Sequence, residues 1–307
     1  MKIGIVISGG DVSGINNFIF QIARLASADI TVFNGGIPGL LDKNHHEVAW
    51  RDLVDFSITS IPIITSGRTS RKLLRSEYET IAKKIKSLRI DVLIMAGGDG
   101  SLQFLNTLSE FDINCFGVGM TIDNDVYGSD YTIGFSTACE QIIKEVSRLR
   151  NTGRALPGRV FMVEILGGYC GELTLQSAIK SNADIALIPE SQMPLEALAE
   201  RVKHKLKQQN SVVILCSEGY TREYSPGFQG AIDTMIKQLE PQIGVRIRKT
   251  IVGYGLRSGD PTCEEIYQGT IMACEVVRCI QSGMKNKAII INSSNKPIPI
   301  DLVSMKK

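Results

Sequence analysis

Short apolar runs alternate with helical patterns along this chain, and most of the runs end in a glycine turn. The first run, 2–8, is rich in β-branched residues, which is typical of a strand buried on both faces. It leads through Gly9 and Gly10 into a helical pattern at 15–26. Alternating strands and helices predict an α/β fold with parallel sheets, here in two lobes.

The same patterns set the bounds of the expected elements. We expect strands at 2–8, 29–33, 58–65, 90–95, 115–119, 159–166, 184–188, 211–216, 248–254 and 287–291. We expect helices at 15–26, 78–88, 136–149, 195–207, 230–239 and 264–281. Because the adjacent His45 and His46 lack the i, i+4 spacing of a helical metal site, we expect a surface loop there.

The composition of the 307 residues excludes several classes of protein. With 43% hydrophobic and 21% charged residues, the chain has enough apolar surface to form a core, which argues against disorder. A net charge of +2 gives no general affinity for nucleic acid. Seven dispersed cysteines without a CxxC pair indicate reduced thiols in a cytoplasmic protein. No apolar stretch reaches the roughly 18 residues of a membrane span, so we expect no membrane association.

Glycine-rich or charged loops follow four of the expected strands. They hold Gly9 and Gly10, Arg68, Asp99, and the pair Asp123 and Asp125. Loops at the carboxyl ends of parallel strands share one crevice, so we expect these groups to converge. Backbone N–H groups, an arginine, a carboxylate for a metal and a base are the parts that phosphoryl transfer needs.

Two of these loops also have a simpler interpretation. The turn after the first run is neither GxGxxG nor a Walker A motif, so it is either an anion site or a plain strand-to-helix connection. Arg68, Arg71 and Lys72 form either a phosphate clamp or the solvated first turn of a helix.

The carboxylate pair is likewise open to two interpretations. Asp123 and Asp125 stand two residues apart after the apolar run 115–119. If the strand continues that far, alternation sends both side chains to the same side. Otherwise they belong to a polar turn, for which Asp and Asn are common residues.

A series of motifs then indicates a family. In chain order they are ISGGDVSGINN, AGGDGS, TIDND with DYTIGF, PGRVFMVEILGG, IPE, SEGY and GYGLRSG. This series resembles the phosphofructokinase family, and TIDND with DYTIGF is its most specific part. The resemblance implies two Rossmann-like three-layer lobes with mainly parallel sheets. Residues 1–135 plus about 256–300 would bind the phosphoryl donor and the metal, and about 136–255 plus the C-terminal tail would bind the sugar phosphate.

The resemblance also implies an activity. The chain would be a 6-phosphofructokinase-type kinase that moves a phosphoryl group from ATP to the 1-hydroxyl of fructose 6-phosphate or a related sugar phosphate, with Mg²⁺. The alternatives are a pyrophosphate-dependent phosphofructokinase and a catalytically impaired homologue that binds sugar phosphate. Because the family completes its sugar-phosphate site between subunits, the resemblance implies a homo-oligomer, either a tetramer or a dimer, with shared active sites.

The groups that act in the transfer follow from the matched motifs. By resemblance, Asp123 would be the base that receives the sugar hydroxyl's proton, with Thr121 at the transferring phosphoryl group and Asp125 beside it. Arg68 would stabilise the charge that develops, and Asp99 would support Mg²⁺.

The donor side depends on a second set of residues. By resemblance, Gly10 would present its N–H to a donor phosphate, and Gly100 and Ser101 would complete the nucleotide site with Asp99. Gly100 favours ATP, because pyrophosphate-dependent members usually carry Asp there. Met120 matches neither donor class.

Two further positions bear on which phosphoryl donor is expected. Phe104 replaces a glycine near the nucleoside in bacterial ATP-dependent members, so adenine would sit differently or be excluded. Tyr254 is common in pyrophosphate-dependent members.

The acceptor site, by the same resemblance, consists of Arg159, Leu166, Gly167, Glu218, Arg248, Tyr254 and Arg257. Arg257 would bind the sugar's phosphate from its own subunit, whereas Arg159 and Arg248 would reach it from a neighbouring subunit. Glu218 would accept hydrogen bonds from sugar hydroxyls. Gly168 replaces an arginine of the family's usual motif, which leaves the identity of the sugar open.

Overall fold

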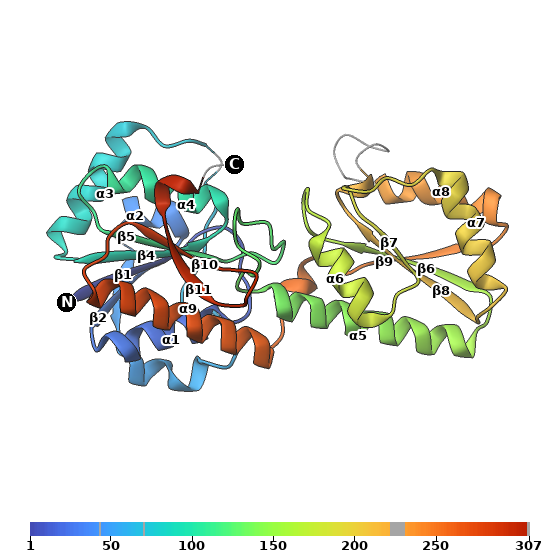
Figure 1. The fold of residues 1–307 in the computed structure, drawn as a ribbon, viewed down its shortest axis with the longest axis horizontal. Helices are drawn as coiled ribbons and strands as arrows, with labels where there is room; N and C mark the ends of the chain where they lie inside the picture. The colour runs from blue at the N-terminus through green and yellow to red at the C-terminus, as the bar shows by residue number, and fades with distance from the viewer. Residues whose placement is uncertain (43, 70, 222–230, 306–307) are drawn as a thin grey trace. The chain divides into compact units, whose positions relative to one another are not determined.

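The computed structural model describes residues 1–42, 44–69, 71–221 and 231–305. They form two compact units, one of Met1–Thr137 with Arg257–Lys307 and one of Ala138–Leu256 (Figure 1). Each unit contains a sheet with helices on both faces. The prediction of an α/β fold with mainly parallel sheets is therefore confirmed. Ser70 and the first residue expected for the helix at 230–239 lie outside the described residues.

A sheet of seven strands forms the centre of the first unit, in the order β11-β10-β5-β4-β1-β2-β3. The strands are β1 (Lys2–Ile7), β2 (Asp29–Phe33), β3 (His45–Val48), β4 (Val92–Gly97), β5 (Cys115–Gly119), β10 (Lys287–Ile291) and β11 (Pro297–Asp301). Strands β10, β5, β4, β1 and β2 are parallel, and the edge strands β3 and β11 are antiparallel to their neighbours. The neighbours β5, β4 and β1 therefore deliver their carboxyl-terminal loops to the same edge of the sheet.

Helices cover both faces of this sheet. The bounds are α1 (Ile15–Ala26), α2 (Gly36–Leu41), α3 (Arg75–Ser87), α4 (Asp99–Ser109) and α9 (Cys263–Gln281), with 3-10 helices at Trp50–Phe56 (η1) and Leu302–Ser304 (η4). Figure 1 shows α2, α3 and α4 on one face and α1 and α9 on the other. Leu40, Ile81 and Leu105 from the first group pack with Leu93 and Met95 of β4 in one apolar core.

The second unit has a parallel sheet in the order β7-β8-β6-β9. Its elements are α5 (Phe135–Ala155), β6 (Arg159–Ile165), α6 (Glu172–Ser181), β7 (Ile185–Leu187), α7 (Leu195–Leu206), β8 (Ser211–Ser217), α8 (Ala231–Ile243), β9 (Ile247–Ile251) and the 3-10 helix η3 (Gly253–Arg257). Val160 of β6 and Ile214 of β8 are buried with Leu198 of α7 and Met235 of α8.

The strand predicted at 58–65 does not form. The Asn16 side chain donates from Nδ2 to the backbone carbonyls of Phe56, Thr59 and Ile61, at 3.2, 3.0 and 2.7 Å. Pro62 also lacks the N–H that a sheet would need. The carbonyl groups of this apolar segment are thus satisfied by a distant side chain rather than by a neighbouring strand.

Three further differences from the expected elements concern the edge strands and the helices. The residues expected to form a histidine loop make the edge strand β3, which pairs with β2. The strand at 287–291 is not the last one, because β11 follows and pairs with β10. This places the C-terminal tail in the first unit rather than in the second, where it was expected. Helices α2, α4 and α6 begin inside or directly after glycine turns and were not expected.

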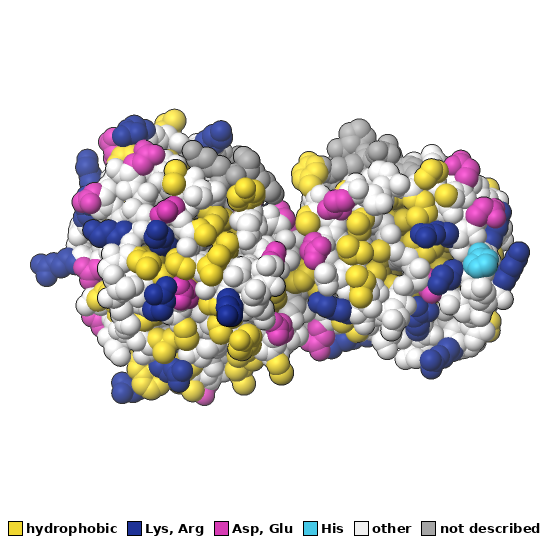
Figure 2. Space-filling view, in the orientation of Figure 1, with side chains coloured by type: hydrophobic (Ala, Val, Ile, Leu, Met, Phe, Trp, Pro, Cys, Tyr) yellow, Lys and Arg dark blue, Asp and Glu magenta, His cyan; other side chains and the backbone are white. Residues whose placement is uncertain are grey.

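None of the described helices is both long and apolar enough to cross a membrane. Figure 2 shows basic and acidic side chains interspersed on the visible face of each unit. This mixture agrees with the small net charge of the sequence, +2.

Candidate functional site

The loops that follow β1 and β4 lie against each other. The backbone N–H of Ser8 donates to the carbonyl of Ala96 at 2.9 Å, and Ser101 Oγ donates to the carbonyl of Ser8 at 3.4 Å. A Cβ at Gly97 would overlap Ser101 and the Ser8 carbonyl, so this approach requires glycine. The two predicted glycine loops therefore do converge.

Helix α4 begins at Asp99, directly after Gly98. The first backbone N–H groups of a helix have no helical partners, and the helix dipole is positive at this end, so both favour an anion. A Cβ at Gly98 or at Gly100 would meet no atom within 4 Å. The start of α4 thus borders open space in which a phosphate group can approach the backbone.

The segment 120–135, which contains the carboxylate pair, is attached to this same loop. The Met120 N–H donates to the carbonyl of Gly97 at 2.9 Å. The Tyr127 N–H donates to Oδ1 of Asp99 at 3.1 Å. Asp99, Met120 and the following turn are therefore parts of one assembly within the first unit.

Asp123 and Asp125 lie in a turn, because β5 ends at Gly119 and the strand does not continue to them. The strand alternation that would have aligned the two side chains does not apply here. The Asp123 N–H donates to Thr121 Oγ1 at 3.1 Å, and Asn124 has a φ of 53°. Both carboxylates are partly buried. The polar-turn interpretation describes the local structure, and the turn stands beside the glycine loops.

Arg68 follows a segment that pairs with the first glycine loop. The Gly9 N–H donates to the carbonyl of Gly67 at 3.1 Å, and Ser66 Oγ donates to the carbonyl of Gly9 at 3.2 Å. Arg68 is exposed. Its backbone is held next to the loop by its neighbours, and its long side chain is accessible to a ligand.

Arg71 does not act as the phosphate clamp that was one interpretation of this cluster. Its guanidinium binds both carboxylate oxygens of Glu77, at 2.6 and 2.7 Å. Glu77 also accepts the N–H of Leu74 at the start of α3, at 2.8 Å. Arg71 therefore stabilises a helix start, and Lys72 is exposed.

Arg257 packs on the first glycine loop. A Cβ at Gly10 would overlap its guanidinium, and its Nη1 lies 3.5 Å from Oδ1 of Asp11. Its side chain is 14% exposed. The structure thus places this arginine, which was expected on the acceptor side, directly against the loop expected to contact the donor.

In the second unit, Leu166, Gly167 and Glu218 gather at the carboxyl end of the sheet, just after β6 and β8. Glu218 Oε1 accepts the N–H of Gly167 at 3.1 Å and the N–H of Gly168 at 2.7 Å. The carboxylate is thereby fixed in place. Glu164 of β6 lies close to it and was missed, since a single acidic residue in an apolar strand gave little signal. Burial, followed by the negative charge of Glu218, raises the pKa of Glu164.

Arg159 and Arg248 are at the opposite end of that sheet. Arg159 begins β6, and Arg248, near the start of β9, pairs with Phe161. Because the strands are parallel, neither arginine lies at the carboxyl end where Glu218 stands. Tyr254, in η3, is 81% exposed. Within the second unit, the predicted acceptor residues therefore do not form a single cluster.

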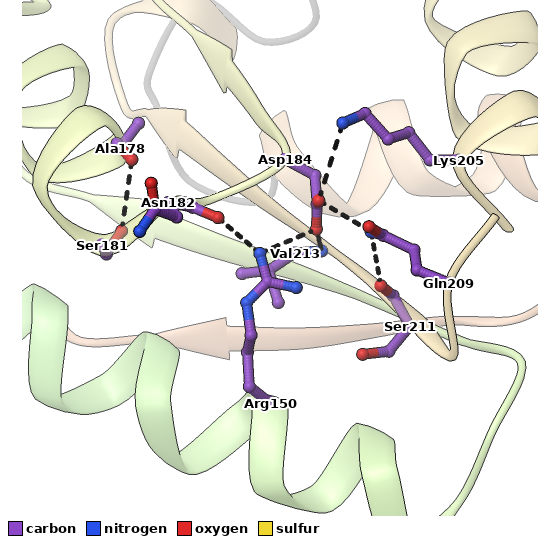
Figure 3. Close-up of polar contacts among 9 residues, drawn as sticks. All are labelled: Arg150, Ala178, Ser181, Asn182, Asp184, Lys205, Gln209, Ser211 and Val213. Atoms are coloured by element: carbon purple, nitrogen blue, oxygen red, sulfur yellow. Dashed lines mark hydrogen bonds and ion pairs between the residues drawn. The ribbon is translucent and has the colours of Figure 1, made fainter.

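A polar cluster around Asp184 was not anticipated from the sequence (Figure 3). Asp184 accepts from Gln209 Nε2 at 2.7 Å and from the Val213 N–H at 2.8 Å, and Arg150 Nη2 lies 3.3 Å away. Lys205 Nζ is 4.0 Å from the same carboxylate. A cavity of 720 Å³ is lined by Asp184, Ile185, Ala197, Glu200, Arg201, His204 and Lys205. Arg201, His204 and Lys205 of α7 thus border this cavity.

Asp99 has the properties expected for a magnesium ligand. A carboxylate is the type of group that Mg²⁺ prefers, and this one stands at the open start of α4. Among the described residues, no three His, Cys, Asp or Glu side chains form a metal cluster. Magnesium that arrives with phosphates needs one or two carboxylates from the protein, so the groups present fit such an ion.

Comparisons with known proteins agree with this geometry. A sequence profile described as Phosphofructokinase matches residues 2–280. A probable ATP-dependent 6-phosphofructokinase from Mycoplasma pneumoniae is 33% identical over 98% of this chain and 90% of its own length. An ATP-dependent 6-phosphofructokinase from Teredinibacter turnerae is 30% identical over 95% of this chain and 90% of its own length.

Solved structures match as well. Phosphofructokinase from Saccharomyces cerevisiae has a TM-score of 0.85 and 25% identity, over 99% of this chain and 45% of that longer chain. A pyrophosphate-dependent phosphofructokinase from Marinobacter aquaeolei has a TM-score of 0.86 over 100% of this chain and 84% of that chain, and at 18% identity it bears on the fold alone. The profile match across most of the sequence and the two relatives at 30% identity or more show that this chain is an enzyme of the phosphofructokinase family.

Proposed function

We propose that this protein transfers the terminal phosphoryl group of ATP to the 1-hydroxyl of fructose 6-phosphate or a related sugar phosphate. The observation that carries the proposal is the attachment of the segment 120–135 to Asp99 through the Tyr127 N–H, at 3.1 Å. It brings a turn with two carboxylates next to an open helix start that suits a phosphate.

In this mechanism, Asp123 takes the proton of the sugar hydroxyl as that oxygen attacks the phosphorus in line. Thr121 Oγ1 accepts the Asp123 N–H at 3.1 Å, which fixes the turn, and Asp125 stands beside it. Arg68 supplies positive charge to the transferring group. Gly10 would present its backbone N–H to a donor phosphate. Gly100 and Ser101 lie in the first turn of α4, where Gly100 borders open space.

A magnesium ion, when bound with the donor, would be held by Asp99 and would neutralise charge on the phosphates. The protein's own part is to hold this carboxylate in place through the Tyr127 N–H.

Several features favour ATP over pyrophosphate as the donor. The relatives from M. pneumoniae and T. turnerae are named ATP-dependent. Gly100 keeps open the space that a larger side chain would occupy. Met120 is 2% exposed, and Phe104 is 4% exposed and stacks on Tyr78 at 5.2 Å between ring centroids. Both side chains pack into the interior of the first unit. Although Met120 and Phe104 differ from the residues usual in ATP-dependent members, they would therefore have little direct contact with the donor.

Within the second unit, Glu218, Leu166 and Gly167 would hold the sugar of the acceptor. Gly168 has a φ of 58°, a left-handed conformation that disfavours the arginine found there in other members. An acceptor with a different contact at this point, such as a longer sugar phosphate, fits the departure.

We also propose a cytoplasmic homo-oligomer, tetrameric or dimeric. Arg159 and Arg248 are at the end of their sheet away from Glu218, where they would serve the active site of a neighbouring subunit. Tyr254 is exposed and would join the same shared site.

The deciding experiment supplies purified protein and Mg²⁺ with fructose 6-phosphate and either ATP or pyrophosphate, and measures the bisphosphate formed. We expect product with ATP. Product with pyrophosphate alone would reverse the donor assignment. No product across a panel of sugar phosphates, combined with measurable sugar-phosphate binding, would instead identify a catalytically impaired homologue.

A further inference from the structure

Glu265 is a fully buried carboxylate that none of the proposed catalytic roles uses. It lies in the first turn of α9 and has 0% exposure. Its Oε1 accepts from Tyr131 Oη at 2.8 Å and from the Gly134 N–H at 2.7 Å. Its Oε2 accepts from both the N–H and the Oγ1 of Thr137, each at 3.1 Å.

These donors all come from one stretch of chain. Tyr131 and Gly134 end the segment 120–135, and Thr137 belongs to the first turn of α5. Four donors directed at two oxygens match a group that only accepts, which is the ionised carboxylate. Each donor is neutral, so the contacts orient the segment and do not form an ion pair.

The same side chain also touches the glycine loop after β1. Gly14, the residue before α1, has a φ of 90°, and a Cβ there would overlap Cγ of Glu265. Ser13 Oγ donates to the carbonyl of Gly259, just before α9. The start of α9 therefore contacts the donor-side loop and the end of the catalytic segment at one point.

Two short bonds connect this point to the catalytic turn. Thr132 Oγ1 donates to the carbonyl of Thr121 at 2.7 Å, and the Ile133 N–H donates to the carbonyl of Gly119 at 3.0 Å. A shift of the residues that Glu265 holds would therefore move the backbone at Gly119 and Thr121, which leads directly into Asp123.

We propose that Glu265 is a positioning residue for phosphoryl transfer, which holds the segment 131–137 and thereby sets Asp123 against the glycine loops. The inference rests on the proposed function for its catalytic readout. Its structural part, the ordering of the segment by this carboxylate, stands independently of that function.

Protonation of Glu265 should make the activity depend on pH. Burial raises the pKa of Glu265 to about 7. The ionisable group in contact with it is Tyr131, whose own pKa is raised by burial and by Glu265. Glu264, the preceding residue on α9, is exposed. When Glu265 gains a proton, one oxygen becomes a donor that faces another donor, so catalysis is expected to fall on the acid side of neutrality.

The test compares Glu265→Gln with the matched control Glu264→Gln, which makes the same change at an adjacent, exposed position. We expect Glu265→Gln to lower kcat by roughly 10- to 100-fold, with KM values changed less than about 3-fold, because a misplaced catalytic group mainly affects the chemical step. The fall of kcat below about pH 7 should disappear in this variant. Glu264→Gln should resemble the wild type.

A second readout does not depend on activity. Hydrogen exchange at the Gly134 and Thr137 amides should be faster in Glu265→Gln than in either the wild type or the control variant. Unchanged exchange would overturn the inference even in an inactive protein, whereas an inactive wild type with the expected exchange would overturn only the proposed function. If Glu265→Gln fails to fold, Tyr131→Phe removes a single donor, and an unaltered kcat and pH profile in that variant would refute the assignment.

Discussion

The two units differ in where their polar residues lie at the ends of the strands. In the first unit, the loops after β1, β4 and β5 are hydrogen-bonded to one another, and Asp99, Asp123 and the glycine backbone belong to one assembly. In the second unit, Glu218 is fixed at the carboxyl end of the sheet, while Arg159 and Arg248 stand at the other end. The residues proposed for the transfer thus stand together in the first unit, whereas the proposed acceptor residues of the second unit stand at two ends of its sheet. Changes in the first unit should lower kcat, and changes in the second should raise the KM for the sugar phosphate.

The buried carboxylates repeat this contrast. Glu265 of the first unit is held by neutral donors, whereas Asp184 of the second unit, with a side chain 5% exposed, faces Arg150 and Lys205. Because burial raises the pKa of Glu265 to about 7, this carboxylate is expected to respond to pH near neutrality.

The largest effect is expected for Asp123→Asn. Loss of the base should lower kcat by roughly 100- to 10,000-fold, with a KM for the sugar phosphate close to that of the wild type. Steady-state kinetics of this variant and of Asp130→Asn, an exposed carboxylate in the same segment, would measure it. A rise in KM as large as the fall in kcat would contradict the proposal that the first unit carries out catalysis and the second binds the sugar phosphate.

The second prediction concerns stability and Glu265. Because its pKa rises from 4.5 in the unfolded chain to about 7 in the fold, the native state binds more protons between these values. The contribution is therefore fully present below pH 4.5 and is lost as the pH rises toward 7, a decrease of about 3 kcal/mol in the free energy of unfolding.

Urea unfolding at pH 5 and pH 7.5 would measure this loss. Glu265→Gln should show a smaller dependence on pH than Glu264→Gln. The free energy of unfolding and the activity would then change in opposite directions with pH. An equal pH dependence of stability in both variants would contradict the assignment of this pH response to Glu265.

A smaller effect is expected for Glu218→Gln. A glutamine has one acceptor oxygen where the carboxylate has two, and the weaker contact with sugar hydroxyls should raise the KM for the sugar phosphate by roughly 10-fold. The kcat should change less, as Glu218 belongs to the second unit. Glu196→Gln on α7 is the control, and a variant with normal KM but low kcat would show that the units do not divide the work in this way.

The smallest effect is expected for Arg150→Gln. Asp184 would keep the Gln209 and Val213 donors, so the free energy of unfolding should fall by about 1 kcal/mol, with activity unchanged. Chemical denaturation and a kinetic assay would check both. A loss of several kcal/mol would show that Asp184 depends on its cation far more than its remaining hydrogen bonds suggest.

The parts of the fold that were predictable depend on local patterns. The apolar runs at β1 and β4 and the glycine turns that follow them are local signals, so the convergence of Gly9 and Asp99 followed from sheet geometry. The missing strand at 58–65 was not predictable, because Asn16 reaches it from about forty residues away. For the same reason Glu265 gave no signal, since its partners Tyr131 and Thr137 are 134 and 128 residues distant in sequence.

The edge strand β11 has a consequence for assembly. It contains Pro297 and Pro299, and it covers β10, whose buried Ile289 and Ile291 would otherwise form an apolar sheet edge. Prolines lack the N–H groups that an added strand would need, so this side of the sheet is a poor template for aggregation. Association of copies of this chain is therefore not expected to extend the sheet at the β11 edge.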